Sequence, residues 1–400
     1  MIRKLIYTLS IASLASASAV AQAQEPIRIG EINSYRHQPA FVEPHKHGME
    51  LAVEEINAAG GVLGRPLEMH FRDDNANPGD AVRVADELVS RENVDLLTGV
   101  MLSHVGLAVA DFANRKKILY VASEPVTDKI VWEQGNKYTF RLNTSTYMQA
   151  AMIAPLAAKM KRKRWAVVYP NYEMGQAAVA AFKEQMLKLQ PDVEFVSAQP
   201  VPVGKIDAAA TVQALLADKP DAIFSSIWGG DLLRFLREGR SRGLLNDDMK
   251  VASLFLGEPE YLDFLGKEAP VGWTVLGYPW YDLKTPENEK FVKAYQAKFN
   301  DYPRRGSVIG YTTIYAIAAA IEKAGSTDTE AMIKALEGLD LTSPTGPVHF
   351  RAADHQATMG IYAGTVALRD DKGIMVDWEF LDGKDYLPTE EDALKLRPKK

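Results

Sequence analysis

From residue 25 onward, short runs of Val, Ile and Leu alternate with longer stretches in which apolar residues recur every three or four positions. The first unit shows the pattern. Residues 27–32 are predicted to form a buried strand, 33–44 a long loop, and 48–58 a helix on which Met49 and Val53 share one apolar face. A short apolar run followed by an amphipathic stretch is typical of a strand and its covering helix.

The alternation continues in two series along the chain. In the first series, strands are expected at 67–71, 94–99 and 118–122, and helices at 80–91 and 104–113. In the second series, strands are expected at 165–169, 194–197, 222–226 and 250–254, and helices at 148–160, 175–189, 208–217 and 232–242. Residues 286–336 are largely helical in pattern, and 346–378 contain short strands. This predicts an α/β fold in which each series builds its own parallel sheet, covered by helices on both faces.

The first residues have the pattern of a secretory signal. Arg3 and Lys4 precede an apolar run, 5–20, and small residues at 21–23 offer a cleavage site after Ala23. The alternative is a buried N-terminal helix. We expect a cleaved signal peptide, 1–23, and a mature protein in the periplasm. No cysteine follows the apolar run, so the sequence offers no site for a lipid anchor.

Length and charge narrow the function classes. Removal of 23 of the 400 residues leaves 377, enough for two domains. The loss of Arg3 and Lys4 takes the formal charge from −6 to −8. That balance argues against nucleic acid as a partner, because nucleic-acid binding needs a basic face. The chain has no cysteine, which excludes disulfides and thiolate metal sites.

Motifs for enzymes and cofactors are absent. The sequence contains no G-x-x-x-x-G-K-[ST] phosphate loop and no G-x-S-x-G nucleophile elbow. His45 and His47 lie beside Glu43, so a metal site is conceivable. We expect instead that these side chains are solvated near the start of a helix. We therefore expect no cofactor, no metal and no catalytic residues.

Polar and aromatic residues follow several predicted strands. In an open α/β sheet, ligands bind beyond the carboxyl ends of the strands, where helix N-termini offer free amide hydrogens. Ser103 opens such a helix and could bind a carboxylate, or could serve only as a helix cap. The candidate ligand-binding residues are Tyr35, Arg36, Ser103, His104, Ala122, Ser123, Glu124, Tyr172, Trp228, Asp231, Phe255, Glu258, Trp280 and Tyr281. The many aromatic rings among them suit a pocket that closes on a small molecule.

The run from Gly48 to Glu68, G-M-E-L-A-V-E-E-I-N-A-A-G-G-V-L-G-R-P-L-E, closely resembles the first helix and following strand of the Leu/Ile/Val-binding protein family. Residues 72–75, 81–89, 237–244 and 310–325 continue the resemblance. It implies two doubly wound parallel-sheet lobes joined by three crossovers, near Arg141, Gly277 and Ala357, with a solute in the cleft between them. The implied lobes are 25–142 with 278–356, and 143–277 with 357–400.

The same resemblance implies the periplasmic solute receptor of an ATP-binding-cassette (ABC) importer for branched-chain amino acids or related solutes. Its partners would be a small-molecule solute and the permease and ATPase subunits, and the protein would be a monomer. Family positions that hold an amino acid match Ser103, the turn 122–124, Tyr172, the neighbourhood of Trp228, and residues 255–258.

Two departures from the family bear on the ligand. The loop 33–41 is bulky and cationic where the family has small residues, and Val126 stands where a threonine is expected. These departures leave an aromatic or other small carboxylate as plausible as an aliphatic amino acid. Two other functions remain open: a receptor that reports a ligand to a signalling partner, and an exported hydrolase that uses Glu124, Glu173 and Asp231.

Overall fold

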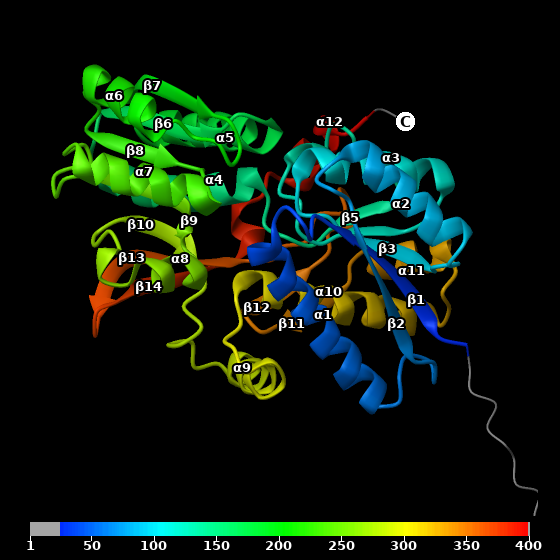
Figure 1. Ribbon diagram of the computed structural model, residues 1–400. Coiled ribbons are helices and arrows are strands. Elements are labelled where there is room, and N and C mark those ends of the chain that lie inside the picture. Colours follow the sequence, from blue (N-terminus) through cyan, green and yellow to red (C-terminus); the bar gives the residue numbers. More distant parts are fainter. Residues whose placement is uncertain (1–24, 399–400) are drawn as a thin grey trace, which may run out of the picture.

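The computed structural model describes residues 25–398, which form two α/β lobes side by side (Figure 1). The expected signal peptide lies outside the described residues. Lobe 1 is built on a five-stranded parallel sheet of order β2-β1-β3-β4-β5. Its strands are β1 (Ile27–Asn33), β2 (Leu67–Asp73), β3 (Leu96–Gly99), β4 (Tyr120–Ala122) and β5 (Thr139–Arg141).

Lobe 2 is built on a seven-stranded sheet of order β14-β13-β10-β9-β8-β6-β7. The strands β6 to β10 pair in parallel, and β13 and β14 form an antiparallel hairpin along one edge. Its strands are β6 (Arg164–Pro170), β7 (Glu194–Val201), β8 (Ala222–Ser225), β9 (Lys250–Gly257), β10 (Thr274–Gly277), β13 (Ile361–Arg369) and β14 (Lys372–Leu381). A separate pair, β11 (Asp340–Ser343) and β12 (Gly346–His349), completes the strands of the described chain.

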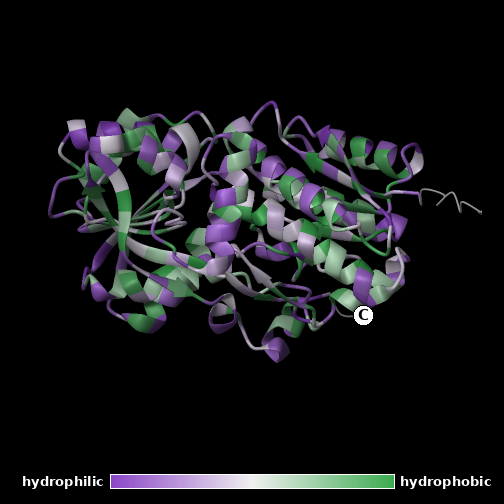
Figure 2. Cartoon of the chain, turned by 90° about the horizontal axis from the view of Figure 1, so that it is seen from below, coloured by the Kyte–Doolittle hydropathy of each residue, from purple (hydrophilic) through white to green (hydrophobic). Residues whose placement is uncertain are grey.

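Helices cover both sheets, and hydrophobic residues gather along the strands and the inner sides of the helices (Figure 2). Lobe 1 carries α1 (Pro39–Ala58), α2 (Pro78–Ser90), α3 (Ser103–Lys116), α9 (Pro286–Phe299), α10 (Arg305–Ala324) and α11 (Thr329–Leu336). Lobe 2 carries α4 (Thr146–Lys159), α5 (Glu173–Leu189), α6 (Ala208–Asp218), α7 (Gly229–Ser241) and α8 (Pro259–Leu265). Within residues 25–398, no helix is long and apolar enough to cross a membrane.

Two glycines let α1 and α10 pack at very short range. A Cβ atom added to Gly48 would lie 2.0 Å from the backbone oxygen of Ser307, and one added to Gly310 would lie 2.0 Å from that of His45. Neither glycine could therefore carry a side chain without moving the helices apart. This packing places the beginning of α10 next to the first turns of α1.

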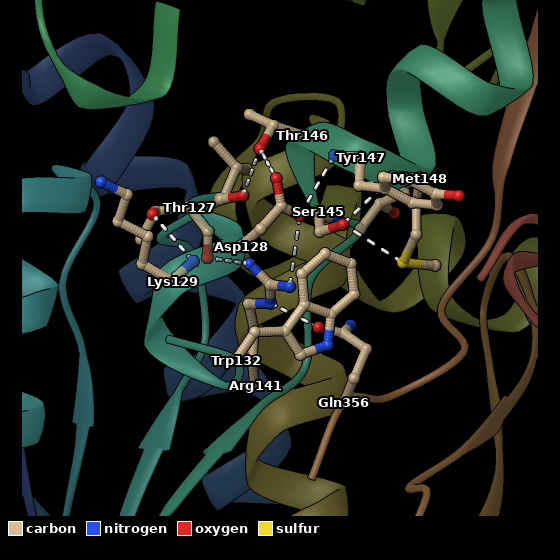
Figure 3. A network of polar contacts seen from close by, with 12 residues as sticks. Thr127, Asp128, Lys129, Trp132, Arg141, Ser145, Thr146, Tyr147, Met148 and Gln356 are labelled. Atoms are coloured by element: carbon tan, nitrogen blue, oxygen red, sulfur yellow. Dashed lines mark hydrogen bonds and ion pairs between the residues drawn. The ribbon is translucent and has the colours of Figure 1, made fainter. Parts of the chain in front are cut away.

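Two of the chain segments that join the lobes are bound to each other. The backbone amide of Arg141 donates to His355, and that of Ala357 donates to Arg141, at 3.0 and 2.8 Å. The buried guanidinium of Arg141 also donates to the side chain of Gln356 and to the backbone oxygen of Thr127 (Figure 3). Arg141 and residues 355–357 thus form one hydrogen-bonded unit.

The structure confirms the expected α/β fold with a parallel sheet in each lobe. The crossover positions expected near Arg141, Gly277 and Ala357 stay a proposal. Two expectations were wrong in detail. The first concerns the segment 33–44, which is not all loop, because α1 already begins at Pro39. Proline has a favourable φ at the first helical position, and a second proline, Pro44, is accommodated inside the helix.

The chain end also differs from its expected place in lobe 2. After β14, the chain runs through α12 (Glu390–Leu396), which lies near α3 in Figure 1. Arg397 then donates to the backbone oxygens of Val131 and Asn136, at 3.1 and 3.2 Å. Since both oxygens belong to segments between β4 and β5, the last residues pack on lobe 1.

Candidate functional site

A cavity of about 120 Å³, partly open to solvent, lies between the lobes. Its walls come from the beginnings of helices and the ends of strands in both lobes, where unpaired backbone amides and exposed loop side chains converge. The lining from lobe 1 includes Phe41, Pro44, Met101, Leu102, Glu124, Val126, Arg304, Arg305 and Ile309. The lining from lobe 2 and the connecting segments includes Asn143, Gln149, Tyr172, Met174, Trp228, Leu254, Phe255, Glu258, Glu260, Tyr261 and Ile361.

Aromatic rings meet across the cleft. Phe41 of α1 contacts Trp228 edge-on, with ring centres 5.6 Å apart, and lies 6.1 Å from Tyr261 of α8. His104 of α3 contacts Tyr172, which precedes α5, edge-on at 5.8 Å. Because each pair joins one lobe to the other, the structure has the two lobes in contact along the cleft. The rings also give the cavity rigid apolar walls.

Two arginines line this cavity, Arg304 and Arg305, and Arg305, the first residue of α10, contacts lobe 2. Arg305 donates from Nη2 to Asn143 Oδ1 at 3.1 Å and to Thr144 Oγ1 at 2.8 Å, and its Nε lies 3.8 Å from Glu258 Oε1. Burial lowers the pKa of Arg305, and burial holds the pKa of Glu258 well above its usual range against the opposing charge of Arg305. An arginine with planar, fixed donors is suited to bind a carboxylate.

Several acceptor atoms at the cavity have no partner among the described residues. These are Gln149 Oε1, Glu258 Oε2 and Glu260 Oε2. Burial raises the pKa of Glu260 to about 7. Buried acceptors without partners are costly, so a bound molecule that brings hydroxyl or ammonium donors would satisfy them.

Glu124, which follows β4, is the acidic group of the lobe 1 wall and is 8% exposed. Its Oε2 accepts a hydrogen bond of 2.6 Å from Asn33. Burial raises the pKa of Glu124, and His45 opposes this rise. The cavity therefore combines aromatic walls, two partly buried arginines and three carboxyl groups.

Comparison with known proteins places this geometry in a family. The family described as "Periplasmic binding protein" matches residues 26–373. The chain belongs to this periplasmic binding protein family. A Leu/Ile/Val-binding protein homolog 7 of Brucella suis is 26% identical over 352 residues, covering 84% of this chain and 87% of the relative. A leucine-, isoleucine-, valine-, threonine- and alanine-binding protein of Pseudomonas aeruginosa is 24% identical over 348 residues, covering 87% and 91%.

Among solved structures, a solute-binding protein of an ABC transporter from Rhodopseudomonas palustris BisB5, in complex with 3,4-dihydroxybenzoic acid, has a TM-score of 0.82. It is 25% identical, and the match covers 90% of this chain and 98% of that one. By their names, these are a solute-binding protein of an ABC transporter, an amino-acid-binding protein and a homolog of a Leu/Ile/Val-binding protein. The present chain is accordingly a solute-binding protein of the periplasm and not an enzyme.

In this periplasmic binding protein, five residues singled out from the sequence line the interlobe cavity: Glu124, Tyr172, Trp228, Phe255 and Glu258. Each lies just beyond the carboxyl end of a parallel strand or at its last residues. The rule that ligands bind at these strand ends is the reason the sequence could indicate them.

Four further candidates lie immediately behind or beside the cavity wall. Ser103 is the first residue of α3, next to the lining residue Leu102, and its buried Oγ has no partner among the described residues. His104 follows it and contacts Tyr172. Ala122 and Ser123 are fully buried just before Glu124, and the Ser123 Oγ is also without a partner in the described chain.

The other five candidates have different surroundings. Arg36 points outward beside Asp73, with 76% of its side chain exposed, and Tyr35 donates from its hydroxyl to Glu31 at 2.8 Å. Asp231 accepts from the amides of Gly204 and Ile206 at a neighbouring cavity.

Trp280 stacks on Tyr302 with ring centres 5.3 Å apart, and the hydroxyl of Tyr281 accepts from the amide of Met375. None of Tyr35, Arg36, Asp231, Trp280 and Tyr281 belongs to the lining of the interlobe cavity.

Sequence reasoning missed Phe41 and Arg305, and it placed His45 wrongly. Phe41 lay in the supposed loop, and His45, expected to be solvated, is fully buried because α1 packs on α10. A signal for Arg305 does exist in the sequence. The helix dipole favours anions at the start of a helix, so two arginines there are unfavourable for the helix itself. Their presence indicates that they have another role.

Proposed function

We propose that this protein is the periplasmic receptor of an ABC importer for a small carboxylate that has an aromatic or apolar body and also bears a hydroxyl or ammonium donor. The observation that carries the proposal is Arg305, whose side chain is only 11% exposed, at an aromatic-lined cavity. Arg305 would bind the carboxylate in two parallel hydrogen bonds, because the guanidinium geometry matches a carboxylate.

The donor on the solute is supported by the acidic side of the cavity. Glu124, Glu258 and Glu260 together with Gln149 offer acceptors, three of them without a partner within the described chain. A plain hydrocarbon acid would leave these groups unsatisfied, whereas a hydroxybenzoate or an amino acid would bind them. Both solute classes occur among the relatives, so both belong to the proposal.

Binding would proceed by closure of the two lobes about the crossovers. The solute contacts both lobes only when they are together, and its higher affinity for that form shifts the population toward it. The permease and ATPase subunits of the importer would then recognise the closed protein. We further propose that the mature chain begins at Gln24, after signal cleavage, and acts as a freely diffusing monomer.

Calorimetric titration tests the proposal. The purified mature protein is titrated with 4-hydroxybenzoate and with leucine, which present the same carboxylate on an aromatic and an aliphatic body. We expect saturable binding of at least one of them with a stoichiometry of one. Absence of binding by both solutes, in a protein whose thermal unfolding is cooperative, would contradict the proposed solute class. Micromolar leucine binding without a response to 4-hydroxybenzoate would restrict it to amino acids.

A further inference from the structure

A buried polar cluster lies behind the lobe 1 wall of the cavity, formed by Glu31, Asn33, His45 and Glu124. Nδ1 of His45 is 3.6 Å from Glu31 Oε1 and 3.6 Å from Glu124 Oε2. The amide of Asn33 donates to both carboxyl groups, at 3.1 Å to Glu31 and 2.6 Å to Glu124. The two carboxyls and the imidazole therefore share one site, and only Glu124 also reaches the cavity.

The cluster lacks the charges that would let all its groups ionise. Glu31 and His45 are completely buried, and neither ring nitrogen of His45 has a hydrogen-bond partner among the described residues. Two carboxylates that share one amide donor in a buried site repel each other, so at least one proton is retained. Burial raises the pKa of Glu31 to about 8 and lowers that of His45.

Glu124 connects this cluster to the solute. Its Oε2 is bound by Asn33, while its Oε1 has no hydrogen-bond partner in residues 25–398. An ionised Glu124 would accept a hydrogen bond from a solute hydroxyl or ammonium better than a protonated one, because charge roughly doubles the strength of such a bond.

We infer that Glu124 loses a proton when a donor-bearing solute enters the cavity, whereas Glu31, which does not line the cavity, keeps its own proton. The inference rests on the proposed function. The O–H bond of the Glu124 carboxyl breaks, its proton passes to water and buffer, and a hydrogen bond from the solute donor to the carboxylate takes its place.

Other titratable groups face the cluster from each element around it. They are Tyr35 in the loop after β1, Lys46 on α1, Asp74 after β2 and Tyr120 on β4, and behind them Glu43 acts on Tyr35 and His104 on Asp74. Asp74 disfavours further negative charge at Glu31 and Glu124, and Lys46 favours it at Glu31. The hydroxyl of Tyr35 donates to Glu31 Oε2, which leaves Glu31 Oε1 toward His45.

The direction of the pH effect follows from the proton release. If the solute binds the ionised form, the affinity rises with pH between the pKa of Glu124 in the complex and its higher pKa in the empty protein. Release of one proton changes the dissociation constant by at most about tenfold per pH unit. Above the higher pKa the affinity becomes independent of pH.

Calorimetry in two buffers of different ionisation enthalpy measures the proton directly. The titrant is 4-hydroxybenzoate or leucine, whichever binds, and the comparison is benzoate or 4-methylpentanoate, which lack the hydroxyl or amino group. We expect the donor-bearing solute to release a measurable fraction of one proton and the donor-free analogue to release less. Equal release by both solutes, or heats that do not depend on the buffer, would overturn the inference while leaving the proposed function standing.

Variants locate the proton. Glu124→Gln should abolish the release, and Glu31→Gln should leave it largely intact, because a neutral amide replaces a neutral carboxyl and keeps the bond from Asn33. Glu391→Gln, whose carboxyl on α12 is 83% exposed, is the matched control and should release as the wild type does. Release that persists in Glu124→Gln would place the proton elsewhere and refute the inference.

If neither solute binds, an infrared measurement on the solute-free protein tests whether Glu124 is protonated. The infrared difference spectrum of wild type minus Glu124→Gln at neutral pH should contain the band of a protonated carboxyl. Its absence would show that Glu124 is already ionised in the empty protein, which would overturn the inference. Its presence would show that Glu124 is protonated in the empty protein, as the inference requires.

Discussion

Arg305 of lobe 1 and Glu258 of lobe 2 face each other across the cleft, with Nε 3.8 Å from Oε1, beside the segment that joins the lobes. At that distance the pair is not a full hydrogen bond, and the carboxyl keeps one oxygen without a partner in the described chain. A solute carboxylate can therefore bind Arg305 without breaking a strong ion pair, and a solute donor can bind Glu258. The pair thus gives a solute one contact on each lobe, with Arg305 on lobe 1 and Glu258 on lobe 2.

Arg305→Ala should weaken solute binding by about 1.5–3 kcal/mol, or roughly ten- to a hundredfold in Kd, because hydrogen bonds to a charged group are lost. Titration calorimetry with 4-hydroxybenzoate or leucine measures the change. Arg305→Lys should recover only part of the affinity, since an ammonium does not bind a carboxylate in two parallel bonds. Arg237→Ala, with 58% of that side chain exposed, serves as the control. An unchanged Kd in Arg305→Ala would remove this residue from the binding site.

Phe41→Ala should make the closed form less favourable. The substitution removes the contacts with Trp228 and Tyr261 across the cleft, and such aromatic pairs contribute about 0.5–1.5 kcal/mol each. We expect a larger radius of gyration in small-angle X-ray scattering without solute, and a weaker affinity. Phe264→Ala, at a residue that is 60% exposed, should change neither quantity. Equal radii for wild type and Phe41→Ala would contradict the role of this contact.

The fold could be predicted because its signals are local. Strands β1 to β4 and β6 to β9 begin within two residues of the apolar runs that indicated them, since a buried parallel strand needs an uninterrupted run of Val, Ile and Leu. The carboxyl ends of those strands then located Glu124, Tyr172 and Trp228. The location of these three residues follows from the sheet topology alone, because the carboxyl ends of parallel strands lie at the same edge of a sheet.

The rest of the site depends on contacts between distant parts of the chain. Arg305 approaches Glu258 from a helix that packs on α1 through Gly48 and Gly310, and no sequence pattern links these positions. The candidate Arg36 lies away from the cavity for a related reason. A cationic loop is suited to bind a carboxylate, but the Arg36 side chain is more stable in water beside Asp73 than it would be buried. His45 is buried by the same helix packing.

Ser103→Ala should weaken solute binding by about 1–2 kcal/mol if its Oγ binds the solute carboxylate, since one hydrogen bond to a charged group is lost. The hydroxyl is buried at the start of α3 and has no partner in the described chain, so a bound solute is a reasonable partner. Calorimetry gives the affinity, and circular dichroism checks the helix content. Unaltered affinity with an intact fold would limit Ser103 to a role in beginning the helix.

Glu31→Gln should change how stability depends on pH. Burial raises the pKa of Glu31 from 4.5 to about 8, so the folded protein holds its proton over a range in which the unfolded chain loses it. The contribution of Glu31 to stability is complete below pH 4.5 and is lost as the pH rises to about 8. Urea unfolding at several pH values should show a smaller fall in the free energy of unfolding for Glu31→Gln than for wild type. Parallel curves would show that Glu31 ionises in the folded protein at its ordinary pKa.

Gly310→Ala should destabilise lobe 1 by about 1–3 kcal/mol, because the new Cβ would lie 2.0 Å from the backbone oxygen of His45 and would force α10 away from α1. The same displacement would move His45 and Arg305, so solute affinity should fall together with the midpoint of thermal unfolding. Gly230→Ala in α7 is the matched control: its Cβ would meet only the flexible end of Arg234, at 3.1 Å, and little change in stability is expected. A Gly310→Ala protein with wild-type stability and affinity would show that the two helices can separate without disturbing the cavity.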